Sequence, residues 1–231
     1  GGTWTGRPFR ATDAAFSVVV PREALGTTLS VTLGGATMDV ALPEHIALGD
    51  EPAGQAELTP DATRALVFTS AIERKAITVV DLEARTFVTH PLRKGVRAVV
   101  IAPDGQNAII FHTKIAGEPV PGEPEDDFIA KSHAYSLFEI GSGYSKIETV
   151  DAEPGEFAFG ESGDRFYLVL SDEAKDVRQV EIVHLDSFRT QSLRLGSHPE
   201  HVGTIPNEGA AKVYASQKHP VARMTFIDVN M

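Results

Sequence analysis

The chain has 231 residues, of which 32 are acidic and 21 are basic, so its formal net charge at pH 7 is −11. This negative charge argues against broad binding to nucleic acid, because phosphate groups are bound by clustered Lys and Arg side chains. Cysteine is absent, which excludes disulfides, thiolate metal sites and cysteine nucleophiles. The 42% hydrophobic content is typical of a globular protein, and no apolar run approaches the roughly 18 residues of a membrane span.

The N-terminal part predicts short β-strands. Apolar and β-branched residues alternate or cluster over residues 15–20, 28–33, 36–42 and 45–48. The chain opens on Gly1-Gly2-Thr3-Trp4, without the charged and apolar regions of a signal peptide. The absence of cysteine suits an oxidising compartment, so we expect a periplasmic, cell-surface or secreted location.

The sequence repeats from about residue 51 onward. Each repeat has a short apolar strand, a turn and a second apolar strand, and the turns are anchored at Pro60, Pro103, Glu161 and Pro206, which are 43, 58 and 45 residues apart. A third apolar strand follows in each repeat, carrying Asp81, Glu139, His184 or Asp228. The first three of these residues each precede the next turn anchor by 22 residues.

A fourth, more polar strand ends most repeats, at residues 86–92, 145–150 and 190–195. Four short strands in a unit of about 40–45 residues are the signature of a β-propeller blade. The sequence therefore predicts an all-β fold, a single β-propeller domain over residues 1–231 with four-stranded antiparallel blades. About five blades are visible, near residues 14–50, 51–92, 93–151, 152–196 and 197–231.

The last predicted blade stops before its outer strand, and this leaves two interpretations open. A strand around Thr3-Trp4-Thr5 completes the last blade and closes a five-bladed ring, or the chain is a fragment of a larger ring.

The repeats resemble a known group of propellers. The segments Leu48-Gly49-Asp50-Glu51-Pro52, Thr59-Pro60-Asp61 and Val79-Val80-Asp81-Leu82 are similar to the YVTN-type, or lactonase-like, repeat, and so are their counterparts after Leu195. The resemblance covers about residues 48–231. Val96 departs from it where a proline is expected, and so does Glu161-Ser162-Gly163 in place of Pro-Asp-Gly. The resemblance implies the fold, whereas the family includes surface-layer proteins, binding scaffolds and lactonases.

The sequence carries no phosphate-binding loop, G-x-S-x-G nucleophile elbow or His-Glu-x-x-His motif. Any site must therefore consist of residues from different loops that the ring brings together.

The loops that lead into each blade are expected to surround one mouth of the central channel. They carry the candidate ligand-binding residues Glu51, Arg97, Glu153, Glu156, His198 and His201. No cofactor is predicted; Glu156 and His201 are candidate ligands for a divalent cation such as Ca²⁺ or Zn²⁺. The alternative is that these residues bind no ligand and form a solvent-exposed rim in which opposite charges compensate one another.

The one irregular insertion, at residues 115–133, is acidic and rich in Pro and Gly. It is predicted to lie on the same face as the candidate rim, and long loops in compact folds are often functional or disordered. As a partner-binding loop it would use Glu123, Glu125, Asp126, Asp127 and Phe128.

The leading hypothesis is a non-catalytic propeller scaffold that binds a protein partner or small ligand through the channel-mouth face, without nucleic-acid binding or a membrane span. The alternative is a metal-dependent, lactonase-like hydrolase with its site at the channel mouth.

Overall fold

The computed structural model describes residues 2–3, 17–20, 28–33, 36–41, 48, 53–160, 163–205 and 212–228. Its Cα atoms group into two compact units, Gly1–Asp50 and Glu51–Met231. The described residues are nearly all in β-strands or turns, which confirms the all-β prediction. None of the described helices is long and apolar enough to cross a membrane.

The first unit contains one antiparallel sheet in the order β1-β2-β3-β4. Its strands are β1 (Gly2–Thr3), β2 (Ser17–Val20), β3 (Thr28–Leu33) and β4 (Ala36–Ala41). Gly2 and Thr3 pair with Val20 and Val19. The strand at Thr3 therefore pairs within the first unit, and both interpretations of the last predicted blade stay predictions. The strand expected at 45–48 lies outside the described residues, except for Leu48, which is not in a strand.

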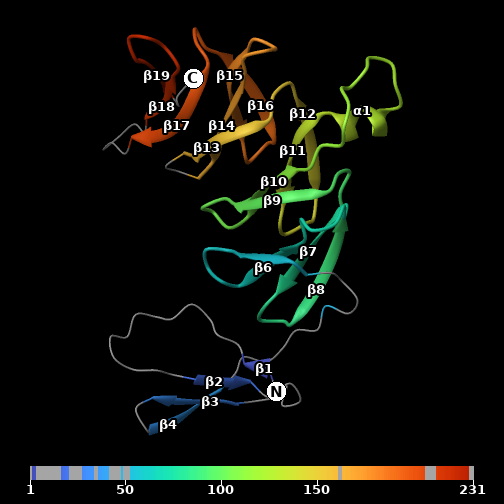
Figure 1. Cartoon of the computed structure of the whole chain (residues 1–231), viewed down its shortest axis with the longest axis vertical. Helices are drawn as coiled ribbons and strands as arrows, with labels where there is room; N and C mark the ends of the chain where they lie inside the picture. The colour runs from blue at the N-terminus through green and yellow to red at the C-terminus, as the bar shows by residue number, and fades with distance from the viewer. Residues whose placement is uncertain are drawn as a thin grey trace. The chain divides into compact units, whose positions relative to one another are not determined.

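The second unit is a succession of antiparallel sheets in which each strand pairs with the next along the chain (Figure 1). The first sheet contains β5 (Gln55–Leu58), β6 (Arg64–Phe68), β7 (Ala76–Asp81) and β8 (Thr86–Pro91). The second contains β9 (Val96–Ile101), β10 (Asn107–His112), β11 (His133–Glu139) and β12 (Ser145–Val150). The third contains β13 (Pro154–Phe159), β14 (Arg165–Asp172), β15 (Val177–His184) and β16 (Arg189–Arg194). The last described sheet contains β17 (Pro199–Ile205), β18 (Lys212–Gln217) and β19 (Arg223–Asp228). The prediction of four-stranded antiparallel sheets is confirmed.

The turns between the first and second strands of the first three sheets in this unit use left-handed backbone. Ala62, Gly105 and Gly163 occupy the same turn position in three repeats, with φ of 55°, 68° and 73°. In the second copy the Asp104 carboxylate accepts hydrogen bonds from the backbone N–H groups of Gln106 and Asn107. The repeated Pro-Asp-Gly pattern thus corresponds to one turn geometry, which glycine adopts without a steric penalty.

Successive sheets of the second unit pack against each other through apolar side chains. One cluster joins the first and second sheets and includes Leu66, Ile77, Ile110 and Phe138. Another joins the second and third sheets, and a third joins the third and last sheets. The middle strands are apolar on both faces because each inner sheet is covered on both sides, as the fully buried β10 shows.

The insertion at residues 115–133 contains a short helix, α1 (Glu125–Lys131), which the sequence did not predict. Seven residues are too few to show helical periodicity. The charges favour the helix, since three acidic residues lie in its first turn and Lys131 lies in its last. Ile129 packs inward and is 5% exposed.

Candidate functional site

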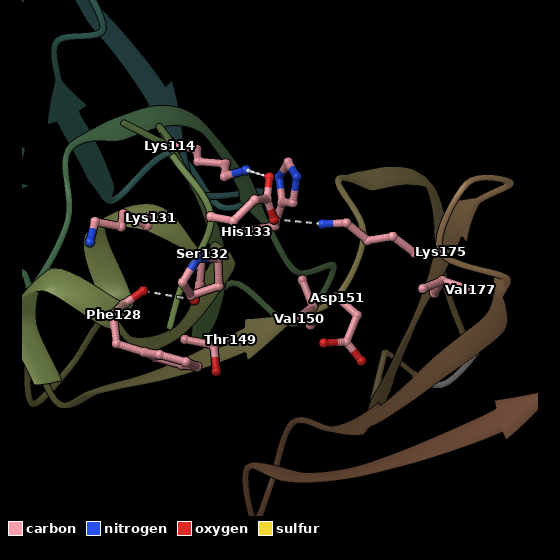
Figure 2. A pocket seen from close by; sticks show the side chains of 12 residues that line it. Lys114, Phe128, Lys131, Ser132, His133, Thr149, Val150, Asp151, Lys175 and Val177 are labelled. Atoms are coloured by element: carbon pink, nitrogen blue, oxygen red, sulfur yellow. Dashed lines mark hydrogen bonds and ion pairs between the residues drawn. The ribbon is translucent and has the colours of Figure 1, made fainter. Parts of the chain in front are cut away.

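A pocket of about 210 Å³ lies between the insertion and the ends of the second and third sheets (Figure 2). Its lining combines three lysines and a histidine with two acidic residues and an apolar wall. The ionisable residues are Lys114, Lys131, Lys175, His133, Glu118 and Asp151, and the apolar residues are Pro119, Phe128, Val150 and Val177. The antiparallel topology places the β10–α1 segment, the β12–β13 connection and the β14–β15 turn at the same end of their sheets.

The insertion is held against this end by Lys94, which is 3% exposed. Its ammonium group donates to the backbone carbonyls of Ile129, Ala130 and Ser132, at 2.7, 3.1 and 2.6 Å. A lysine at the carboxyl end of a helix satisfies carbonyls that have no partner within the helix. Burial, supported by the charge of Lys114, lowers the pKa of Lys94 to about 8.

Most carboxylates of the predicted partner loop already have cationic neighbours within the chain. Arg93 donates to Glu125 at 2.6 Å and to Asp126 at 2.7 Å. Glu123 pairs with Lys131 and also accepts from the Val120 N–H. Asp127 lies in the first turn of α1, and Phe128 is half-buried in the pocket wall. The loop is therefore an ordered part of the pocket in which Ile129 is too buried to meet a partner.

Glu118 is the link between the two sheets at this pocket. Its carboxylate accepts from Lys114, four residues earlier in the segment after β10, at 3.0 Å and from Lys175 of the β14–β15 turn at 2.9 Å. The two ion pairs are drawn as dashed lines in Figure 2. Hydrogen bonds from Lys175 and Lys114 lower the pKa of the Glu118 carboxyl to about 2. The site therefore places two ammonium groups around one anion.

His133 opens strand β11 beside this ion-pair group. Burial, followed by the charge of Lys114, lowers the pKa of His133. The imidazole is therefore neutral at pH 7 and offers one donor and one acceptor to a ligand.

Two of the predicted channel-rim residues meet each other. Arg97 on β9 donates to Glu153 at 2.5 Å, and its guanidinium lies 6.0 Å from the centre of the Phe111 ring. Arg97 is thus engaged in linking the second sheet to the loop before the third.

The remaining candidate residues near β13 and β17 lie at or beside β-bulges at the start of these strands. The register of β13 shifts between Pro154 and Phe157, where Glu156 lies, and that of β17 shifts between Pro199 and His201. Glu156 and His201 are both exposed, on strands that lie against each other. The Nδ1 atom of His198 lies 3.1 Å from the Val177 carbonyl, to which it donates. Glu51 lies outside the described residues.

Among the described residues, no group of three or more His, Asp or Glu side chains is placed to share a metal ion. The suggested Ca²⁺ or Zn²⁺ ligands Glu156 and His201 therefore have no third ligand among these residues.

A serine–histidine pair does occur, on the neighbouring strands β10 and β11. Ser136 Oγ lies 2.7 Å from His112 Nε2, and His112 Nδ1 lies 3.1 Å from the Gly95 carbonyl. Ser136, His112 and the Gly95 carbonyl are thus arranged as a nucleophile, a base and an orienting group would be. Both side chains are buried, however, with 2% and 6% exposure, and neither lines the pocket. We assign the pair a structural role.

The sequence did not single out Lys114, Lys175 or His133 as site residues. A signal was present, since Lys114 directly precedes the insertion and Lys131 and His133 end it. Lys175 is 57 residues from Glu118, and only the packing of two sheets brings them together.

No protein-family model matches the chain, and no curated protein sequence matches it. Among solved structures, the chain is similar to hydrazine synthase of Kuenenia stuttgartiensis, with 17% sequence identity and a TM-score of 0.45. That similarity covers 93% of this chain and 68% of the other. It carries no information about function.

Proposed function

We propose that the sheets of the second unit are blades of a β-propeller and that the protein is a non-catalytic scaffold. It binds a small ligand at the end of the sheets where the insertion lies. The supporting observation for the fold is the chain-order pairing of four short strands in each complete sheet, combined with an apolar cluster between each pair of successive sheets. Membership of the YVTN-type repeat family and a location outside the cytoplasm remain predictions.

The observation that carries the binding function is the construction of the pocket. A buried lysine and the two ion pairs of Arg93 hold the irregular segment against the ends of the strands. The lining of the resulting cavity combines charged and polar side chains with an apolar wall, and small-ligand sites pair apolar surface with polar groups that orient the ligand. Its volume is below the range of about 300–1,000 Å³ typical of sites for drug-sized molecules, so the ligand is small.

The hypothesis that the insertion binds a protein partner has less support than the small-ligand hypothesis. Three carboxylates of the insertion, Glu123, Glu125 and Asp126, are already paired with cations of the same chain. The hydrolase alternative lacks a set of three metal ligands among the described residues.

The binding function is tested by incubating the purified chain with a cell metabolite extract, removing free compounds and identifying retained molecules by mass spectrometry. We expect wild type to retain a compound that Lys175→Met loses. The control is Lys146→Met, at the opposite end of the sheets, where Lys146 lines a second cavity of about 570 Å³ and its ammonium donates to the Phe188 carbonyl. Loss of the compound in this variant alone would place the binding site in that cavity instead. Equal loss in both variants, or no retained compound in wild type, would contradict a binding site at this end.

A further inference from the structure

The pair of lysines around Glu118 defines an anion position in the pocket that a ligand can use. The Glu118 carboxylate and Lys114 belong to the segment between β10 and α1, whereas Lys175 belongs to the β14–β15 turn of the third sheet. Glu118 therefore occupies the position in which two ammonium groups converge, as an external carboxylate would.

Glu118 can leave this position without unfolding any strand. Its side chain is 65% exposed and lies in an irregular segment, next to Gly117, whose φ is +109°. Exposed ion pairs contribute little net stability, because water solvates the separated charges well. Displacement of Glu118 by another anion therefore costs little free energy.

The pocket adds contacts that Glu118 alone does not use. Phe128, Val150 and Val177 form an apolar wall beside the two lysines, and His133 and Thr149 supply uncharged polar groups. A carboxylate with a short apolar body would satisfy both parts of this lining. A second carboxylate on the same ligand would meet the negative charge of Asp151, because the remaining lysine of the lining, Lys131, is already paired with Glu123.

We propose that this pocket binds a small monocarboxylate between Lys114 and Lys175, and that Glu118 is an internal competitor that occupies the anion position when the ligand is absent. This assignment rests on the proposed binding function and specifies its ligand class. The site discriminates against dicarboxylates through Asp151.

The test is a titration of the whole chain with sodium butyrate, followed by ¹H–¹⁵N NMR at pH 7. Sodium chloride keeps the ionic strength constant. Succinate and inorganic phosphate are titrated in parallel. We expect saturable shifts for butyrate at the amides of Ser132, His133 and Thr149, and weaker binding of both other anions.

Three variants test which charged groups control the affinity for butyrate. Glu118→Gln removes the competing charge and should tighten butyrate binding by about tenfold, whereas Lys175→Met should weaken it by at least about tenfold. Lys218→Met is the matched control, because Lys218 pairs with Glu173 across the third and last sheets, as Lys175 pairs with Glu118. Its butyrate affinity should equal that of wild type.

The proposal is overturned if neither wild type nor Glu118→Gln shows saturable shifts at the pocket. It is also overturned if Glu118→Gln binds butyrate no more tightly than wild type, or if phosphate binds as well as butyrate. These outcomes are separable from failure of the proposed function. Retention of a neutral or cationic compound in the extract experiment, lost in Lys175→Met, would keep the binding function and reject the carboxylate.

Discussion

His112 is a buried histidine whose surroundings favour the neutral ring. Because a carbonyl oxygen can only accept, His112 Nδ1 donates to Gly95, and Nε2 accepts from the Ser136 hydroxyl. Burial lowers the pKa of His112 to about 4, compared with about 6.5 in an unfolded chain. The unfolded state therefore binds more protons between these two pH values.

This difference predicts a pH-dependent stability. The contribution of neutral His112 is complete above about pH 6.5 and is lost as the pH falls towards 4, by about 3 kcal/mol in total. Urea denaturation of wild type and His112→Gln at several pH values measures it, and the variant should show the weaker dependence between pH 6.5 and 4. His201→Gln, at an exposed position, should follow wild type; a parallel loss in all three proteins would refute the assignment to His112.

At the scale of elements, the hairpin turn between β11 and β12 is fitted closely against the preceding sheet. Gly143 in this turn has a φ of +74°, and a Cβ atom there would lie 1.9 Å from Cε1 of His90. His90 belongs to β8 and makes an edge contact with the Phe138 ring, with centroids 5.6 Å apart. The turn therefore requires glycine both for its backbone and for the space beside it.

We expect Gly143→Ala to lower the free energy of unfolding by about 2–3 kcal/mol, through left-handed backbone strain and displacement of His90. Gly122→Ala is the control for the backbone part alone, since Gly122 has a φ of +88° and no atom within 4 Å of the added Cβ. It should cost about 1 kcal/mol. Equal losses in the two variants, measured by urea denaturation, would show that the contact with His90 has no energetic role.

At the scale of the whole second unit, stability comes from the interfaces between neighbouring sheets. Leu168 is fully buried in the cluster between the second and third sheets, together with Phe111 and Phe166. Repeat architectures behave approximately as a sum of unit stabilities and nearest-neighbour interfaces, so damage to one interface affects the two sheets that share it most strongly.

Leu168→Ala should therefore cost about 2–5 kcal/mol, because it removes buried apolar contacts and leaves a cavity. Hydrogen exchange should show the largest loss of protection in β9–β12 and β13–β16. Leu58→Ala is the matched control, since Leu58 on β5 is 57% exposed, and it should change stability by less than about 0.5 kcal/mol. A uniform loss of protection in Leu168→Ala, reaching the last sheet as strongly as the second, would contradict this nearest-neighbour picture.

The strands, their order and most of their turns were predictable from the amino-acid sequence alone. Their signals are local: a strand's apolar pattern and a turn such as Pro103-Asp104-Gly105 depend on neighbours only a few residues away. The short helix α1 was missed because seven residues show no helical periodicity and because part of its stabilisation is not local: Lys94 bonds its carboxyl end from a separate strand connection.

The candidate site depended on tertiary structure. Arg97 and Glu153 were both predicted as rim residues, but that they pair with each other follows only from the packing of two sheets. Lys175 meets Glu118 for the same reason, across 57 residues of sequence. A spacing pattern indicates which residues can share a sheet. The juxtaposition of turns from different sheets is decided by apolar packing between the sheets, and that packing brings Lys175 to the Glu118 carboxylate, which Lys114 contacts from four residues earlier.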